Sequence, residues 1–250
     1  MSGKMYSSTV SKAFRILNLF QGGRDELGIS EISYRLEMPV SSVHRLIRSL
    51  EYEGLIAQDR DTRKYYLGPA LLMYSAKASH YAEYERAAEE FVDQLSELTG
   101  ETVNLSVYGF GQICHIYTRQ AAHVLRPNFP LNTPFSVCTT SVGRVFLSHM
   151  GKAAVRWVYE NQAADPDMPF PDFCKMLEKF RKQGYALDDE DFNVGLRCVG
   201  APVCRYDGSV LFAMSISAPV SRMDDEKYAE AAKLVVRYAA LASEKIQSLE

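Results

Sequence analysis

The sequence predicts an α+β fold in two domains, a small helical domain that ends in a β-hairpin and a larger domain built on an antiparallel sheet. Three observations support this prediction. Apolar residues recur at helical spacing through the first 50 residues, two short apolar segments flank a polar turn between residues 55 and 67, and apolar and polar residues alternate from residue 101. A length of 250 residues is sufficient for two domains of ordinary size.

The first two helices are predicted over residues 9–21 and 28–38. The first has an amphipathic stripe of apolar residues three and four positions apart: Val10, Ala13, Phe14, Leu17 and Phe20. Gly22 and Gly23 are expected to end it. In the second helix Ser30 is the predicted N-cap, because its hydroxyl can accept a hydrogen bond from a free backbone N–H of the first turn.

A third helix is predicted to begin at Pro39, where the missing N–H of proline costs little. At 100° per residue, one side of this helix is apolar: Val43, Leu46, Ile47 and Leu50. The opposite side is polar or basic: Ser41, His44, Arg45, Arg48 and Ser49. Small hydroxyls at the start and guanidinium groups further along suit close approach to a DNA major groove. The alternative interpretation is an ordinary solvated helix face.

A β-hairpin is predicted after the third helix. Leu55 and Ile56 lead into the polar segment 59–64, and residues 65–67 return as an apolar strand. Three helices followed by a hairpin with a basic tip form a winged helix-turn-helix, so the order of elements indicates DNA binding. Residues 1–68 carry a net charge of +2 and residues 69–250 a net charge of −5. A locally basic segment is what phosphate contact requires.

Three stretches of this region, SKAFRILNLF, ISEISYRLEMPVSSVHRLIRSLEYEGLI and RKYYLGPALLMYSA, resemble the N-terminal domain of the IclR (isocitrate lyase regulator) family of bacterial transcriptional regulators. The resemblance implies a winged helix-turn-helix domain over residues 5–68, with the third helix as recognition helix, in a ligand-responsive regulator of a catabolic operon. The positions predicted to contact a double-stranded DNA operator are Ser30, Ser41, Ser42, Arg45, Arg48, Arg63 and Lys64.

The connecting segment, residues 67–100, predicts one or two long helices with a bend near Ser79 and His80 and an end at Gly100. A stripe on it is able to pack against a second copy of the chain: Leu71, Leu72, Ser75 and Ala78. Packing on its own domain is the alternative. The family resemblance implies that residues 69–80 are a linker helix through which N-terminal domains pair, giving a homodimer and a homotetramer of two dimers. Two winged helices on one duplex double the readout.

The C-terminal domain is predicted over residues 81–250. Its first strand, residues 102–109, has Val103, Leu105 and Val107 on one face and polar Asn104 and Ser106 on the other. Further strands are predicted at 112–120 and on both sides of the turn Asp207–Gly208. Helices are expected at 141–150, 152–163, 171–184 and 225–248, covering the sheet on one or both faces.

The same domain lacks recognisable catalytic motifs. Adjacent Cys114 and His115 point to opposite faces of a strand, and no G-x-S-x-G, H-E-x-x-H or glycine-rich phosphate loop occurs. The acidic run 188–191 is typical of a solvated loop. We therefore predict a sensor that is not an enzyme and needs no cofactor or metal. The alternative is a metal-dependent sensor or small-molecule enzyme with an N-terminal interaction module, in which His115, Cys138 and Cys198 converge on a metal.

The family resemblance continues through FSVCTTSVGRVFLS, LDDEDFNVGLRCVGAPV and AMSISAPVSR. These stretches are similar to the segments around the effector pocket of IclR regulators, which implies a GAF-like effector-binding domain. The positions implied to line the pocket are Phe135, Ser141, Val142, Asp188, Leu196, Cys198, Ser215 and Ser217. Arg144 departs from the family pattern, in which lysine is usual.

Two features independently indicate that the ligand is a small organic acid. The free N–H groups at the start of the 141–150 helix form an anion site, and Ser215 and Ser217, two apart on a strand, share one face. Asp188 would repel a carboxylate unless it accepts a hydrogen bond from a ligand hydroxyl or is protonated. The prediction is therefore a hydroxy acid or a sugar-derived acid.

The remaining features concern the compartment. The five cysteines are an odd number and form no C-x-x-C pair, which argues against a disulfide framework and a structural zinc site. The N-terminal residues lack the apolar segment of a secretion signal, and no apolar run reaches about 18 residues. We expect a cytoplasmic protein that does not contact membranes.

Overall fold

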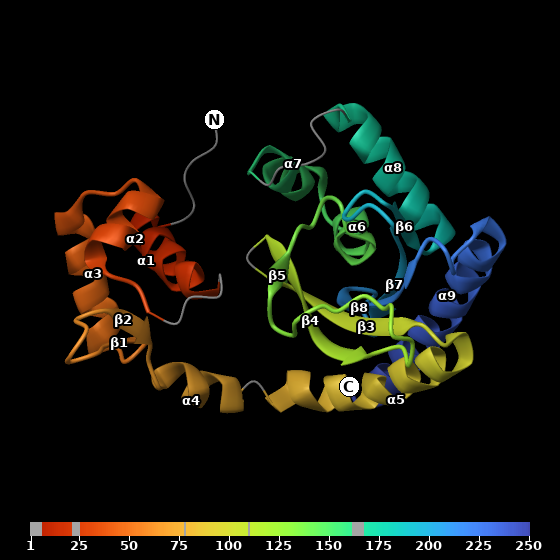
Figure 1. The fold of residues 1–250 in the computed structure, drawn as a ribbon, viewed down its shortest axis with the longest axis horizontal. Coiled ribbons are helices and arrows are strands. Elements are labelled where there is room, and N and C mark those ends of the chain that lie inside the picture. Colours follow the sequence, from red (N-terminus) through yellow and green to blue (C-terminus); the bar gives the residue numbers. More distant parts are fainter. Residues whose placement is uncertain (1–6, 22–25, 78, 110, 162–167) are drawn as a thin grey trace. The chain divides into compact units, whose positions relative to one another are not determined.

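The computed structural model describes residues 7–21, 26–77, 79–109, 111–161 and 168–250 (Figure 1). The chain divides into two compact units, Met1–His80 and Tyr81–Glu250, which are described separately below. Among the described residues, no helix combines the length and the apolar character that a membrane crossing demands.

The N-terminal unit consists of helices followed by a two-stranded antiparallel sheet. Its elements are α1 (Ser8–Asn18), the 3-10 turn η1 (Leu19–Gln21), α2 (Ile29–Leu36), α3 (Val40–Tyr52), β1 (Ile56–Gln58), β2 (Tyr65–Leu67) and α4 (Ala70–Lys77). The core joins α1, α2 and α3 through Ile16, Ile32 and Ile47, all fully buried. The predicted apolar face of α3 is confirmed, because the four predicted residues are the buried ones of that helix.

The buried face of α1 differs from the predicted stripe. Ile16 is fully buried and Phe20 nearly so, whereas Val10 and Phe14 are 54% and 43% exposed. The prediction was wrong for Val10 and Phe14, because the core-facing stripe is centred on Ile16 and is rotated away from them. The predicted stop at Gly22 and Gly23 lies outside the described residues.

The start of α2 also differs from the prediction. Gly28, with extended φ and ψ angles of −84° and 156°, is the N-cap, so Ser30 lies within the first turn and is exposed. The physical reason lies one residue earlier. Leu27, fully buried, exchanges two backbone hydrogen bonds of 2.9 Å with Tyr65 of β2. This pairing holds the chain extended up to Leu27, and the helix begins directly after Gly28.

Two helices follow β2, which is one of the two arrangements predicted for the connecting segment, residues 67–100. They are α4 and α5 (Ser79–Thr99). The predicted stripe residue Ala78 lies outside the described residues, whereas Leu72 of α4 is 75% exposed.

The C-terminal unit contains a six-stranded sheet whose neighbouring strands are all antiparallel. Its strand order is β5-β4-β3-β8-β7-β6. The strands are β3 (Thr102–Gly109), β4 (Gln112–Arg119), β5 (Pro134–Phe135), β6 (Ala186–Asp189), β7 (Leu196–Cys204) and β8 (Val210–Pro219). The helices of this unit, besides α5, are α6 (Ser141–Ser148), α7 (Lys152–Asn161), α8 (Phe170–Gln183) and α9 (Asp225–Gln247).

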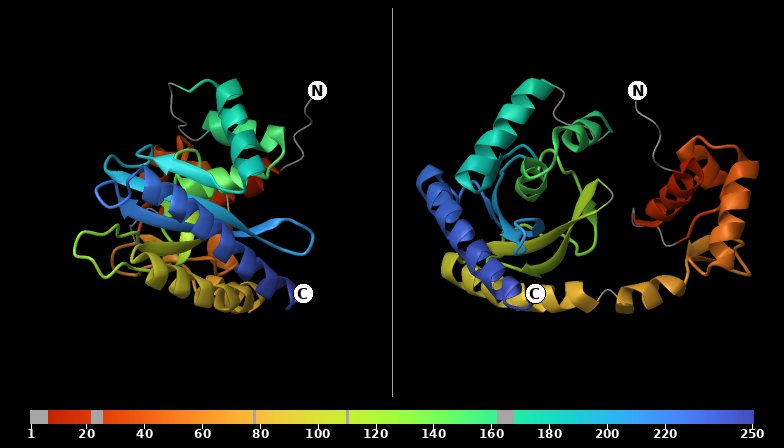
Figure 2. Two further views of the ribbon diagram at one scale, coloured as in Figure 1. Left: turned by 90° about the vertical axis from the view of Figure 1, so that its right-hand side faces the viewer. Right: turned by 180° about the vertical axis from the view of Figure 1, so that it is seen from behind.

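Helices cover both faces of this sheet, as Figures 1 and 2 show. On one face α5 and α9 pack against Val103, Leu105 and Ile216. On the other face α6 and α8 pack around Ile113 and Ala213. Because side chains alternate along a strand, Met214 and Ile216 of β8 enter the first core, whereas Ala213 enters the second.

The acidic run 188–191 is not a solvated loop throughout. Asp188 lies in β6, is only 1% exposed, and is paired in register with Cys198 of β7, whereas Asp189, Glu190 and Asp191 are exposed. The prediction was wrong for Asp188 because residues 186–189 form a strand, β6, that pairs with β7. Side chains alternate between the two faces of a strand, so Asp188 points into the unit and Asp189 points out.

Candidate functional site

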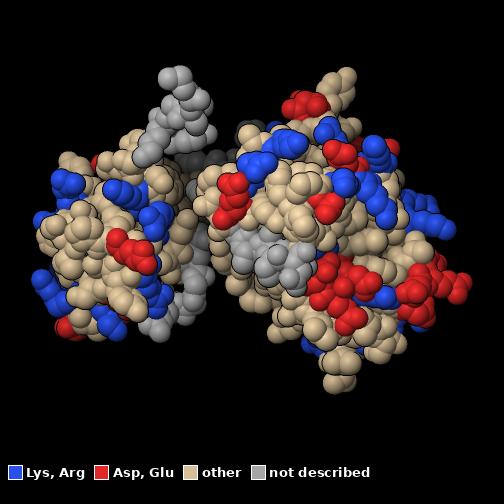
Figure 3. Space-filling view, turned by 90° about the horizontal axis from the view of Figure 1, so that it is seen from above, with Lys and Arg blue, Asp and Glu red and all other residues tan. Residues whose placement is uncertain are grey.

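The first candidate site is the outer face of α3. Its side chains Ser41, His44, Arg45, Arg48 and Ser49 are exposed, and Ser42 is half-buried. Nη1 of Arg48 lies 3.1 Å from Oε2 of Glu51, while the guanidinium of Arg45 has no partner among the described residues. On the face drawn in Figure 3, Lys and Arg side chains outnumber Asp and Glu on the N-terminal unit. Arg45 therefore presents an unpaired guanidinium on this face, and Arg48 presents one that is held by an exposed ion pair.

The wing between β1 and β2 places its cations at the tip. The N–H of Asp59 donates to the carbonyl of Lys64 at 2.8 Å, and Oδ1 of Asp59 accepts from the N–H groups of Thr62 and Asp61. The ionised carboxylate accepts these hydrogen bonds, and they lower the pKa of Asp59, with the largest effect from the N–H of Thr62. The acid thus organises the turn, and Arg63 and Lys64 are left exposed. Arg60, also exposed at the tip, was not among the predicted contacts.

The second candidate site lies in the C-terminal unit, where polar side chains cross the face of the sheet that lies under α6. Nδ2 of Asn104 lies 3.4 Å from Oγ of Ser215 and 3.3 Å from Oγ of Ser217. On the neighbouring strand pair, Oγ of Ser106 and Nδ1 of His115 are 2.8 Å apart. All five are buried, so the polar face of β3 is an interior surface.

A small cavity opens above these side chains. Seven of the eight predicted pocket residues line it: Phe135, Ser141, Val142, Asp188, Cys198, Ser215 and Ser217. Leu196, buried two positions before Cys198 on β7, is not among the lining residues. The cavity also has lining residues that were not predicted: His115, Phe129, Thr140 and Phe192. Its volume of about 20 Å³ is room for a single water molecule.

Asp188 presents an unsatisfied oxygen at this cavity. Its Oδ1 accepts hydrogen bonds from the N–H groups of Asp191 and Phe192, each at 3.0 Å. Its Oδ2 is buried and has no hydrogen-bond partner among the described residues. Burial is the main cause that raises the pKa of Asp188 to about 6, against the opposing backbone hydrogen bond from Phe192 and the charge of Arg144. A buried oxygen without a partner is costly, and a ligand donor would relieve that cost.

The N-terminus of α6 borders the same cavity. Thr140 is the N-cap, and its Oγ1 accepts from the N–H of Gly143 at 3.2 Å. Ser141 and Val142 are the first two helical residues, whose N–H groups have no acceptor within the helix. Gly143 allows this placement, because a Cβ there would lie 2.2 Å from the carbonyl oxygen of Val137. The helix start can therefore hold an anion close to the sheet.

Aromatic rings close the cavity. The ring centroid of His115 lies 5.2 Å from that of Phe129 and 5.0 Å from that of Phe135. The ring centroids of Phe192 and Phe135 are 5.9 Å apart. Burial lowers the pKa of His115 to about 4, so its imidazole is neutral at physiological pH. Phe129 and Phe192 come from loops, where no periodicity identifies an inward side chain. His115 could have been found, because it pairs in register with Ser106 on the polar side of β3.

The alternative interpretation places His115, Cys138 and Cys198 around a metal ion. Across the described ranges, no three or more His, Cys, Asp or Glu side chains are grouped so that they could hold a metal ion. His115 and Cys198 line the cavity, whereas Cys138 is buried in the core between α6 and α8. Burial raises the pKa of both thiols, that of Cys138 to about 11, which disfavours the thiolate that a metal requires.

Comparison with known proteins agrees with both halves of the molecule. Residues 9–60 match the IclR helix-turn-helix domain, and residues 76–244 match the bacterial transcriptional regulator IclR C-terminal domain. The transcriptional regulator KdgR of Escherichia coli is 29% identical over 228 residues, which cover 89% of this chain and 86% of KdgR.

Solved structures share the fold. An IclR-type regulator from a Silicibacter species superposes with a TM-score of 0.84 at 24% identity, covering 96% of each chain. An IclR homologue from Microbacterium hydrocarbonoxydans, crystallised with 4-hydroxybenzoate, has a TM-score of 0.71 at 17% identity and covers 96% of this chain and 100% of its own.

Proposed function

Because the chain belongs to the IclR family of bacterial transcriptional regulators, we propose that α3 and the wing bind a specific DNA operator, and that the cavity beneath α6 binds the effector. The proposed effector is a small hydroxy acid or sugar-derived acid, and the regulated genes form a catabolic operon. The named relatives are regulators and not enzymes.

The DNA-binding proposal depends on the outer face of α3. Ser41 lies at the start of the helix and allows close approach to a groove, and Arg45 follows one turn later with an unpaired guanidinium. Arginine donates two hydrogen bonds to a guanine edge or to a phosphate, which gives both affinity and register. The exposed cations Arg63 and Lys64 of the wing add phosphate contacts.

The effector proposal depends on one observation, the buried Oδ2 of Asp188 that has no partner among the described residues. Above pH 6 this carboxylate is ionised and accepts a hydrogen bond from a ligand hydroxyl. The N–H groups of Ser141 and Val142 would take the ligand carboxylate. Ser215 and Ser217 would orient its other oxygens. A hydroxyl and a carboxylate on one small molecule satisfy all of these groups.

The size of the cavity indicates how binding would act. A volume of about 20 Å³ excludes an organic acid, so the aromatic side chains that close it must move when the ligand enters. Phe192 belongs to the loop whose N–H groups bind Asp188. A ligand that requires the opened arrangement shifts the protein toward it by its difference in affinity between the two states.

Self-association is the third part of the proposal. Leu72, Met73 and Tyr74 of α4 are 75%, 72% and 63% exposed, an unusual density of large apolar side chains on solvent-facing helix positions. A second copy of the chain that packs here would bring two recognition helices to one duplex. We propose a homodimer through α4, and two such dimers in a homotetramer. The double variant Leu72→Glu with Met73→Glu should halve the mass measured by light scattering.

The decisive experiment is a fluorescence-anisotropy titration of the DNA upstream of the chain's own gene, with and without a panel of carboxylic acids that includes 4-hydroxybenzoate. We expect specific binding that weakens steeply between 50 and 200 mM salt, as for any protein that neutralises several phosphates. Arg45→Ala should abolish operator binding and leave acid-induced thermal stabilisation intact. Arg237→Ala on α9, which also removes one arginine, is the control.

Two outcomes would contradict the proposal. If Arg45→Ala binds operator as well as the parent, α3 is not the reading helix. If Asp188→Ala is stabilised by the active acid as strongly as the parent, the cavity is not the effector site. Turnover of an organic acid, or a stoichiometric metal, would favour the enzyme or metal-dependent sensor.

A further inference from the structure

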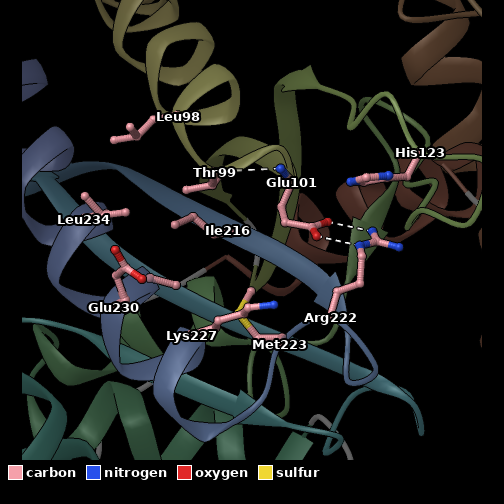
Figure 4. Close-up of a pocket in the computed structure, with 11 residues that line it drawn as sticks. Leu98, Thr99, Glu101, His123, Ile216, Arg222, Met223, Lys227, Glu230 and Leu234 are labelled. Atoms are coloured by element: carbon pink, nitrogen blue, oxygen red, sulfur yellow. Dashed lines mark hydrogen bonds and ion pairs between the residues drawn. The ribbon is translucent and has the colours of Figure 1, made fainter.

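A second and larger cavity lies in the C-terminal unit, with a volume of about 400 Å³ (Figure 4). It is bounded by the end of α5, the start of β3, the loop after β4 and the first half of α9. The side chains that decide its chemistry are Leu98, Glu101, Ile216, Arg222, Lys227 and Glu230. This volume is in the range of sites that hold small molecules.

This cavity is separate from the proposed effector cavity. Ile216 contributes to its floor, whereas the neighbouring Ser215 and Ser217 of β8 line the other cavity. Because successive side chains of a strand point to opposite faces, the two cavities lie on opposite sides of the sheet. Their lining residues do not overlap.

One pair of charges in the wall is already satisfied. Nε and Nη2 of Arg222 lie 2.6 and 2.7 Å from the two carboxylate oxygens of Glu101. Nη1 of Arg222 donates to the carbonyl of Leu125 at 2.8 Å. Glu101 is 7% exposed, so this bidentate pair is a fixed part of the wall and does not compete for a ligand.

Two opposite charges in the lining remain open. Lys227 and Glu230 lie one helical turn apart on α9, and neither side chain has a hydrogen-bond or ion-pair partner among the described residues. In Figure 4 the ammonium group of Lys227 points toward the Glu101–Arg222 pair, and the carboxylate of Glu230 points away from it. The lining thus offers one cation and one anion, separated along one wall.

The opposite wall and the floor are apolar. Ile216 and Met223 are buried, and Leu98 at the end of α5 is 58% exposed beside the cavity. An exposed leucine next to buried apolar residues gives a ligand an apolar surface to cover, and covering that surface favours binding. The site therefore combines two opposite charges with an apolar patch.

We propose that this cavity binds a small zwitterion with an apolar side chain, that is, an α-amino acid of the leucine type. Its carboxylate contacts Lys227, its ammonium group contacts Glu230, and its side chain packs on Leu98 and Ile216. Lys227 and Glu230 are both exposed, so a simple carboxylic acid loses only the contact with Glu230, and a simple amine loses only the contact with Lys227. The proposal does not depend on the identity of the effector.

The test is isothermal titration calorimetry of the full chain with three probes: L-leucine, 4-methylpentanoate, which lacks the amine, and isopentylamine, which lacks the carboxylate. We expect saturable binding of leucine and at least about tenfold weaker binding of the other two, the loss expected when a charged hydrogen bond is removed. Lys227→Ala and Glu230→Ala should each weaken leucine binding by about the same factor. Lys233→Ala, an exposed lysine of α9 that is not in the lining, should leave it unchanged.

A variant of the other cavity decides where leucine binds. Ser217→Ala should retain leucine binding, because Ser217 lies on the opposite face of β8. Three results would overturn the proposal: no saturable binding of leucine, equal binding of 4-methylpentanoate, or binding that Ser217→Ala abolishes and Lys227→Ala does not affect. Circular dichroism of each variant excludes loss of folding as the cause.

Discussion

Nη1 of Arg144 lies 2.6 Å from Oδ2 of Asp191 and 2.7 Å from the carbonyl oxygen of Leu187, and its Nε donates to the carbonyl of Cys138 at 2.9 Å. This buried side chain of α6 thus joins the segment before its own helix to β6 and to the loop after β6. The N–H of Asp191 in that loop donates to Asp188. The geometry of the proposed effector cavity therefore depends on Arg144.

Replacement of Arg144 should destabilise the C-terminal unit. In Arg144→Met the carbonyls of Cys138 and Leu187 lose their donor, and we expect the free energy of unfolding to fall by about 2–4 kcal/mol. Asp191 is partly exposed and can be hydrated, which keeps the loss below that of a fully buried pair. Urea unfolding followed by the fluorescence of Trp157, the one tryptophan of the sequence, measures this.

Arg156→Met is the control for Arg144, because its ion pair with Glu160 is exposed and its other contact is a cation–π contact, with Cζ 4.2 Å from the centroid of the Phe170 ring. The exposed pair and the exposed cation–π contact together contribute about 1 kcal/mol, less than the loss expected for Arg144→Met. Equal free energies of unfolding for Arg144→Met and the parent would show that the three hydrogen bonds of Arg144 do not stabilise the C-terminal unit.

Asp188 should make the stability of this unit depend on pH. Its pKa is about 6 in the folded protein and about 3.8 when exposed, so between these values the folded state binds more protons than the unfolded state. Asp188 therefore contributes a loss of stability of roughly 2–3 kcal/mol at most as pH rises from about 4 to 6. His115, whose pKa is lowered to about 4, contributes a gain over the same interval, so the effect of Asp188 is read from the difference between a variant and the parent. Asp188→Asn removes the titration, so its stability relative to the parent should increase over that interval. A difference that is constant from pH 4 to 7 would contradict the raised pKa.

Much of the candidate DNA-binding face could be predicted from sequence, because a helix of 13 residues repeats its environment every 3.6 positions. Helical spacing therefore predicts Val43 and Ile47 in the core and Arg45 on the surface. The start of α2 could not be predicted in this way. It depends on the pairing of Leu27 with Tyr65, which are distant in the chain.

The proposed effector cavity shows the same division. Alternation in β8 correctly placed Ser215 and Ser217 on one face, since strand periodicity is local. The burial of Asp188 depends on its pairing with Cys198 across a loop, and the inward positions of Phe129 and Phe192 depend on loop conformation. An acidic run and two loop phenylalanines carry no periodic signal that would reveal these positions.

Removal of the partner of Arg48 should strengthen DNA binding. Glu51 holds the guanidinium of Arg48 at 3.1 Å on the outer face of α3. In Glu51→Gln the arginine is free and one negative charge is lost, so we expect affinity for DNA to rise about threefold to tenfold and the salt dependence to steepen. Glu53→Gln removes the same charge without releasing Arg48 and should have the smaller effect. Equal effects of the two variants would assign the change to net charge alone.

The close contact of α6 with the preceding segment should make Gly143 irreplaceable. A Cβ at Gly143 would lie 2.2 Å from the carbonyl oxygen and 2.5 Å from the Cα of Val137, both backbone atoms that cannot turn aside. Gly143→Ala must therefore displace the start of α6 from the sheet, at a cost of about 1–3 kcal/mol or more. It should also weaken binding of the effector acid, because the N–H groups of Ser141 and Val142 move with the helix.

Gly151→Ala, where an added Cβ meets nothing within 4 Å, is the control and should be neutral in both measurements. If Gly143→Ala retains the stability and the acid affinity of the parent, the helix start does not form the anion site.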